Sequence, residues 1–170
     1  VENVGSYVGT CAGFFISSNG VYKEGEEYTP NDKYLSIWPG TAHTTGLYDS
    51  YTAMESVEGS PLLKYFQFGG DGRVDSLYHC GGAYAYYGEG GIIPEGTEPL
   101  MRYVYDTVAA DAPTRHMHNQ VSSLAYKKSA QTGRVVVTGS HPESITSGDR
   151  LEYMAAMMLY AMDGNGTTRV

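Results

Sequence analysis

A cysteine at a glycine-lined corner is the first feature of this sequence that could do chemistry. Cys11 lies within GTCAG, residues 9–13, directly after a short apolar run. A nucleophile between small residues at a strand-to-helix turn is typical of a nucleophile elbow, where bulky neighbours do not fit. We expect the following helix to lower the pKa of the thiol and to leave the amide of Ala12 free to bind an oxyanion. A buried structural cysteine among glycines would give the same pattern.

A histidine and a glutamate two residues apart supply the matching acid–base pair. The apolar run VVVTG, residues 135–139, is followed after one residue by His141, Pro142 and Glu143. Pro142 favours an extended conformation for His141, and side chains two apart on an extended segment point the same way. Glu143 can therefore orient the imidazole while its other nitrogen faces a thiol. Together with Cys11, the pair predicts a Cys-His-Glu triad.

Strands and helices of an α/β domain must position these residues. Residues 6–10 predict a buried strand, and residues 12–19 predict a short helix that ends at Asn19 and Gly20. Further strands are predicted over residues 34–38, 74–79, 123–128 and 134–139, the last two as a hairpin or as adjacent strands.

The last predicted element is a helix with a clear apolar period. Its apolar positions are Leu151, Met154, Ala155, Met158, Leu159 and Met162, and Gly164 follows as a stop signal. The spacing predicts that this stripe covers one face of the sheet.

The order of Cys11, His141 and Glu143 resembles the triad of class I glutamine amidotransferase-like domains. In α/β-hydrolases the acid precedes the histidine, so the order discriminates between the two. YVGTCAGFF, YLSIWPGTA, SLYHCGGAYAYY and GRVVVTGSHPE are similar to the branch called biotin-protein ligase N-terminal-like, over nearly the whole chain. The resemblance implies a flavodoxin-like, mostly parallel sheet with helices on both faces. It does not extend to the biotin-transferring domain, which has a separate fold.

The resemblance also implies a missing upstream part. Domains of this family begin with several β/α units and a Gly-Gly loop that donates the second oxyanion amide, all before the elbow. Residues 1–170 are therefore expected to form the C-terminal portion of one amidotransferase-like domain. Because a central parallel strand needs neighbours on both edges, we expect a bound companion chain, the N-terminal portion of the same precursor.

Residues near the predicted site could contact a substrate. Ligands of open α/β sheets collect at the carboxyl ends of strands, such as the end predicted at residue 38. The glycine-rich run at 79–91 lacks the Lys-Ser/Thr end of a phosphate loop and predicts a tight turn beside the site. The predicted substrate contacts are Thr41, His43, Gly81, Gly82 and Tyr84.

No metal or other cofactor is expected. His79, Cys80, His116 and His118 match no standard zinc spacing.

Composition limits the partners and the compartment. The 170 residues carry a formal net charge of −8 and no membrane-length apolar run, so nucleic acid and membranes are not expected partners. The 16 Tyr, 22 Gly and the sequon at 165–167 favour a secreted or extracytoplasmic protein, with a cytoplasmic one as the alternative. Cys11 and Cys80 could form a disulfide or remain two thiols.

The sequence therefore predicts a cysteine-dependent hydrolase or amidotransferase-like enzyme. Cys11 would attack an amide of the glutamine type or a peptide amide, either as a small molecule or within a peptide. The alternative is a non-catalytic binding or structural module on the same scaffold, in which Cys11 holds a ligand or is tied to Cys80.

Overall fold

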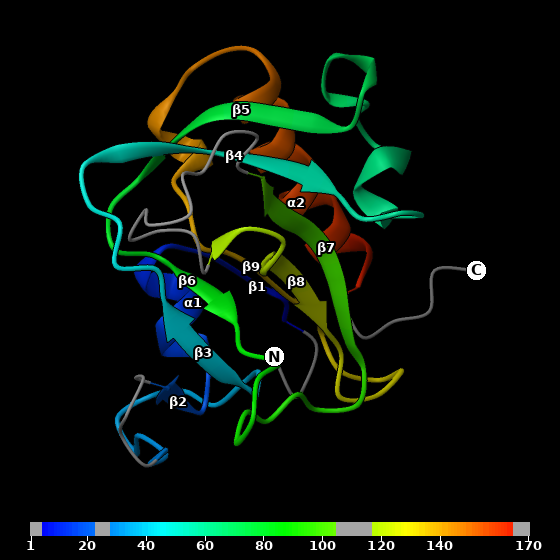
Figure 1. Ribbon diagram of the computed structural model, residues 1–170. Coiled ribbons are helices and arrows are strands. Elements are labelled where there is room, and N and C mark those ends of the chain that lie inside the picture. Colours follow the sequence, from blue (N-terminus) through cyan, green and yellow to red (C-terminus); the bar gives the residue numbers. More distant parts are fainter. Residues whose placement is uncertain (1–4, 23–27, 105–116, 165–170) are drawn as a thin grey trace.

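Nine strands form one mixed sheet in the computed structural model of the protein, which describes residues 5–22, 28–104 and 117–164 (Figure 1). The strands are β1 (Tyr7–Thr10), β2 (Gly20–Tyr22), β3 (Thr41–Thr44), β4 (Ser50–Ser56), β5 (Arg73–His79), β6 (Ala83–Ala85), β7 (Thr97–Val104), β8 (Val121–Tyr126) and β9 (Val135–Thr138). The helices are α1 (Ala12–Ser17) and α2 (Asp149–Asp163), with short 3₁₀ segments η1 (Pro61–Lys64), η2 (Phe68–Gly70) and η4 (Pro142–Ser144).

The sheet is mostly antiparallel. Its main path runs β2-β3-β6-β8-β7-β4-β5, while β9 joins β8 and β1 joins β9. Only the pairs β1–β9 and β2–β3 are parallel among the described strands. The mixed α/β class is confirmed, but the prediction of a mostly parallel sheet is wrong for this part of the chain. Each parallel connection needs a long crossover, usually helical, and the described residues supply only two α-helices.

The valine run of β9 explains how the sheet is covered on both faces. Val135 and Val137 pack into a cluster with Phe14 of α1 and with Trp38. Val136 lies on the opposite face, in a cluster with Met157 of α2. Because alternate residues of a strand point to opposite faces, an unbroken apolar run fits a strand that is buried on both sides.

The final helix exists as predicted, but a different stripe of it is buried. α2 has acidic residues in its first turn, which suits the positive end of the helix dipole, and it ends at Gly164. Its buried residues are Tyr153, Ala156, Met157 and Ala161. Met158 and Met162 of the predicted stripe are half exposed, at 50% and 51%. The prediction of the buried face is wrong because apolar side chains occupy more than one side of this helix.

Three of the other predicted strands are confirmed, and one does not form. The strand predicted at 74–79 and the hairpin of 123–128 with 134–139 are confirmed as β5, β8 and β9. Residues 34–38 are not a strand, and their apolar character has another cause. Trp38 is fully buried 5.5 Å from the ring of Phe14, and its indole nitrogen donates to Thr97 Oγ1 at 2.9 Å.

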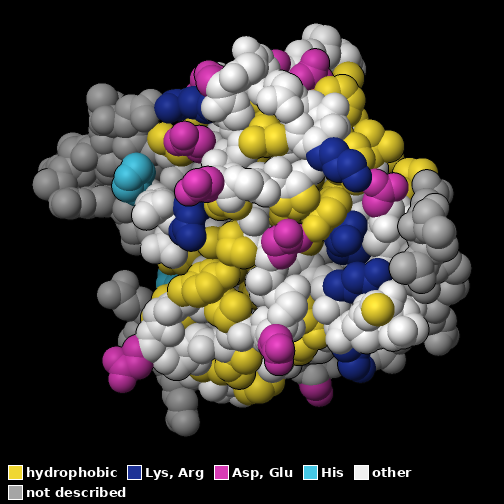
Figure 2. Space-filling view, turned by 90° about the vertical axis from the view of Figure 1, so that its right-hand side faces the viewer, with side chains coloured by type: hydrophobic (Ala, Val, Ile, Leu, Met, Phe, Trp, Pro, Cys, Tyr) yellow, Lys and Arg dark blue, Asp and Glu magenta, His cyan; other side chains and the backbone are white. Residues whose placement is uncertain are grey.

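The surface carries charges of both signs. Figure 2 shows acidic and basic side chains on one face, with hydrophobic side chains between them. Within the described ranges, no helix has the length and hydrophobicity required to span a membrane.

Candidate active site

The chain turns from strand to helix at Cys11. β1 ends at Thr10, α1 begins at Ala12, and Cys11 between them has a φ of +46° and a ψ of −105°. A positive φ is costly for a residue with a side chain and persists where the surroundings enforce it. The Cys11 amide donates to Thr138 O of β9 at 2.9 Å, which holds the corner. A side chain at Gly9 would lie 2.9 Å from the carbonyl group of Gly13, so this turn requires glycine there.

The thiol of Cys11 is buried, and its pKa is higher than that of a free cysteine. Cys11 is 9% exposed, and its Sγ donates to the backbone carbonyl of Cys80 at 3.4 Å. Burial raises the pKa of the thiol, and the nearby Cys80 and Glu143 add to this, whereas the amide of Ala12 lowers it. The expected net lowering of this pKa is wrong, because desolvation outweighs the amide of a six-residue helix.

His141 and Glu143 form the expected pair at the same edge of the sheet. β1 and β9 are parallel with Thr10 opposite Thr138, so both strands end beside each other. His141 Nδ1 lies 2.8 Å from Glu143 Oε1, and the same oxygen accepts a hydrogen bond from Thr10 Oγ1 at 3.1 Å. With the Nδ1 proton directed at the carboxylate, Nε2 keeps the lone pair that a general base needs.

The end of β5 contacts both halves of this site. Tyr78 O accepts the amide hydrogen bond of His141 at 2.9 Å, and Cys80 O accepts that of the thiol. Among the described residues, the thiol therefore donates its hydrogen bond to the backbone carbonyl of Cys80 and not to His141. Proton transfer to His141 requires the thiol to exchange this hydrogen bond.

Two of the predicted substrate contacts are glycines that the packing requires. Gly81 has a φ of +67° and donates its amide to Leu47 O, so it forms the predicted tight turn. Gly82 lies against Gly139, where an added Cβ would be 1.6 Å from the Gly139 carbonyl oxygen. Both glycines lie beside the site, and their contact with a substrate stays a prediction.

The remaining predicted contacts lie along β3 and β6. Thr41 is fully buried and its Oγ1 accepts the amide hydrogen bond of Ile92 at 2.9 Å. The ring of His43 stacks on that of Tyr84 at 4.8 Å. Since Thr44 pairs with Ala83, Thr41 lies at the end of β3 that is farther from Gly82. The prediction for Thr41 and His43 depends on a strand at 34–38 that does not form, whereas that for Tyr84 depends on the glycine-rich run at 79–91.

Three buried polar residues beside the site escaped prediction as site residues. Thr45, His79 and Ser140 are fully buried, and the imidazole of His79 is hydrogen-bonded to both hydroxyl groups. His79 and Ser140 directly precede Cys80 and His141, and this adjacency was the available signal.

The positions of the cysteines and histidines decide whether a disulfide or a metal site forms in the described part of the chain. Cys11 and Cys80 are both free thiols. No group of three or more His, Cys, Asp or Glu side chains in the described part of the chain is arranged to hold a metal ion. His116 and the sequon at 165–167 lie outside the described residues.

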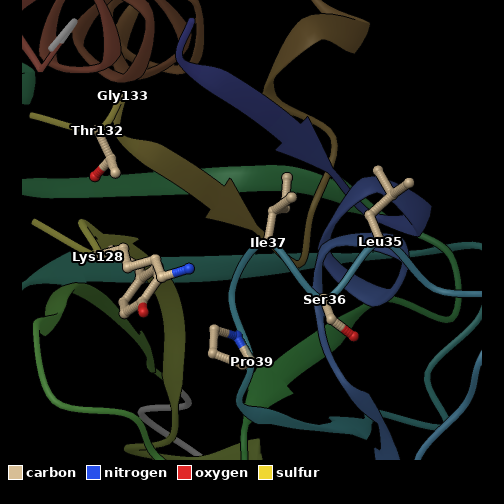
Figure 3. Close-up of a pocket in the computed structure, with 8 residues that line it drawn as sticks. Leu35, Ser36, Ile37, Pro39, Lys128, Thr132 and Gly133 are labelled. Carbon is tan, nitrogen blue, oxygen red and sulfur yellow. The ribbon is translucent and has the colours of Figure 1, made fainter. Parts of the chain in front are cut away.

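Two cavities are lined by neither Cys11 nor His141. One of about 520 Å³ lies between residues 35–39 and the β8–β9 connection, from which Lys128 extends toward that loop (Figure 3). Its residue Gly133 precedes β9, whereas His141 follows β9, so this cavity is at the opposite end of the strand. The other cavity, of about 410 Å³, is a groove between β1 and α2.

Neither the family models nor the curated proteins give a match to this chain.

Proposed function

We propose that the protein is a cysteine-dependent amide hydrolase or amidotransferase-like enzyme with Cys11, His141 and Glu143 as its triad. His141 Nε2 takes the thiol proton, and the Cys11 sulfur forms a bond to the amide carbon. The C–N bond then breaks, and the amine leaves with the proton that His141 returns. Water or an acceptor amine resolves the thioester and regenerates the thiol. The substrate is an amide of the glutamine type or a peptide amide.

One observation carries this proposal. A cysteine in a strained positive-φ conformation ends one strand, and the parallel neighbour of that strand delivers a hydrogen-bonded His-Glu pair to the same edge. Such strain persists where the surroundings over-determine it and gathers at functional sites. Thr10, adjacent to Cys11, shares the carboxylate of Glu143 with His141 and links the two halves.

We propose that two donors form the oxyanion hole. The amide of Ala12 provides one donor, since it lies close enough to the Cys11 sulfur to lower the pKa of the thiol. The second donor comes from a companion chain, the N-terminal portion of the same precursor. This chain would add strands to the outer edge of β1 and extend the parallel part of the sheet that β1 and β9 form.

The surroundings of β1 support this companion. Among the described strands β1 pairs with β9 alone, and the groove along its other edge carries no charged residue. Met154, Met158 and Met162 of α2 line that groove with Val8. An unpaired strand edge beside an apolar helix face is a surface that proteins normally cover.

A non-catalytic module is the second candidate. The neutral thiol and its hydrogen bond to Cys80 favour it, because neither describes an activated nucleophile.

Reaction with 4-nitrophenyl acetate distinguishes the two candidates. The enzyme should release a burst of nitrophenolate with one acetyl group on Cys11, which peptide mapping locates, followed by slower hydrolysis of the thioester. His141→Ala should slow both phases, and Thr97→Val, far from the thiol, should slow neither. Acetylation of Cys80 instead of Cys11, or a burst indifferent to His141, would contradict the enzyme proposal.

A further inference from the structure

The last two residues of β5 and Cys80, which follows them, form a segment that contacts both halves of the site. Tyr78 O binds the amide of His141 and Cys80 O binds the thiol of Cys11, so the backbone of three consecutive residues spans nucleophile and base. The ring of Tyr78 also lies 5.5 Å from that of His141. Any slip of this segment would move both catalytic residues together.

The middle residue of the segment, His79, is anchored in a buried polar cluster. Its Nε2 lies 2.6 Å from Thr45 Oγ1, and its Nδ1 lies 2.9 Å from Ser140 Oγ. Ser140 Oγ lies in turn 2.9 Å from Thr52 Oγ1. The cluster therefore ties β5 to β4, to the residue after β3 and to the residue that directly precedes His141.

The imidazole of His79 is held from its remaining sides as well. Tyr103 meets it edge to face at 5.7 Å, and a side chain at Gly82 would approach its Cε1 to 2.9 Å. Burial, with the nearby His141, lowers the pKa of His79 to about 4. A neutral imidazole has one donor and one acceptor nitrogen, and the two hydroxyl groups satisfy both.

We infer that His79 is a positioning residue, which fixes the Tyr78–Cys80 segment and Ser140 and thereby the placement of His141 and the Cys11 thiol. It touches neither the substrate nor the reacting atoms. A buried, fully satisfied polar cluster rigidifies its surroundings, and a small displacement of catalytic groups has a large kinetic cost. The effect on turnover rests on the proposed function, whereas the effect on the Cys11 thiol does not.

Substitutions of His79 that keep different halves of its contacts test the inference. The amide of His79→Asn ends near the position of Nδ1 and can keep the contact with Ser140. The longer His79→Gln reaches toward Thr45 instead, and His79→Ala keeps neither contact. Thr97→Val is the control, because it removes the hydrogen bond to Trp38 in another part of the core.

The first measurement is the pH profile of Cys11 alkylation by iodoacetamide, which needs no substrate. Loss of the Cys80 carbonyl as acceptor removes a hydrogen bond made by the neutral thiol, so its pKa should shift downward in the Ala and Gln variants. At a fixed pH below that pKa, alkylation should be roughly two- to tenfold faster. The Asn variant and the control should match the wild type. Cys80 and Glu143, which act electrostatically on the thiol, remain in every variant.

The second measurement is hydrolysis of the acetyl thioester after the 4-nitrophenyl acetate burst. A displaced His141 should slow this step by about 10- to 100-fold in the Ala and Gln variants, while the Asn variant retains most of the rate.

A folded His79→Ala protein with the wild-type alkylation profile and hydrolysis rate would overturn the inference. Should His79→Ala fail to fold, identical behaviour of the Asn and Gln variants in both measurements would overturn it equally. If the wild type gives no burst at all, the proposed function fails, and the alkylation profiles still decide the role of His79.

Discussion

The two edges of β1 have different surroundings. On the inner edge, the amides of Tyr7 and Cys11 donate to carbonyl oxygens of Arg134 and Thr138, each at 2.9 Å. Successive residues of a strand present their backbone groups to opposite edges, so Val8 directs its amide and carbonyl to the outer edge. There β1 has no strand partner among the described residues.

The difference between the two edges shows which part of the proposed site the described residues form. The inner edge brings together the strained cysteine, the His-Glu pair and the His79 cluster. The outer edge offers an uncharged groove lined by methionines. The side chains that we propose to be catalytic therefore depend on one edge, and the proposed second oxyanion donor depends on the other.

The largest effect is expected from Gly82→Ala beside the inner edge. The new methyl group would collide with the backbone oxygen of Gly139, and this backbone cannot move without displacing β9. We expect a loss of about 3 kcal/mol or more in the free energy of unfolding, enough to populate the unfolded state. Gly5→Ala, which has open space at the outer groove, is the matched control and should change this free energy by less than about 0.5 kcal/mol. Urea unfolding measures both, and equal effects would contradict the contrast between the edges.

Glu143→Gln tests whether the inner edge forms a working acid–base pair. The substitution keeps an oxygen near His141 Nδ1 and Thr10 Oγ1 but removes the charge that stabilises the imidazolium. We expect thioester hydrolysis to slow roughly 10- to 10⁴-fold, the range for acid-to-amide changes in other triads. The burst should still label Cys11. An unchanged hydrolysis rate would show that Glu143 is only a surface residue.

The site was more predictable from the sequence than the sheet around it. The turn at Cys11 and the contact between His141 and Glu143 depend on local chemistry: small residues at a corner and a two-residue spacing. The direction of the pKa shift of Cys11 is not predictable from local sequence, because burial and the electrostatic effects of Cys80 and Glu143 depend on the tertiary fold. The same holds for the cluster of His79, whose two hydrogen-bond partners, Thr45 and Ser140, come from two separate segments.

Two errors in the fold have a common physical origin. The strand predicted at 34–38 and the buried face predicted for α2 both depend on the spacing of apolar residues. This spacing does not reveal which neighbour covers an apolar side chain. Trp38 is buried against Phe14 of α1 without forming a strand. On α2, Tyr153 and Met157 face the core while Met158 and Met162 are half exposed.

Glutamate substitutions on α2 test whether the outer edge of β1 is a binding surface. Met158→Glu with Met162→Glu should change the free energy of unfolding of the isolated chain by less than about 1 kcal/mol, because both side chains are half exposed. Met157→Glu, one residue away but fully buried, is the control and should unfold the protein.

The same double variant should weaken the binding of the companion chain that we propose. We expect native mass spectrometry of the protein from its source to show a complex of two polypeptides, and the double variant to weaken it by about 10- to 100-fold, the equivalent of burying one methionine side chain. A wild-type protein that is active as a single 18.5 kDa species would contradict the companion.

The smallest effect concerns the acid stability that His79 gives the inner edge. The pKa of His79 is lowered to about 4 in the folded protein, against an ordinary value of 6.5. Below pH 6.5 the unfolded chain therefore binds a proton that the folded protein does not, and the stability falls as the pH falls toward 4. At pH 5 this costs about 1–2 kcal/mol relative to pH 7. His79→Asn has no such proton, so urea unfolding at the two pH values should show a drop that is smaller by this amount. Equal drops in both proteins would mean that His79 is protonated in the folded state, and that its cluster is looser than its distances to Thr45 and Ser140 imply.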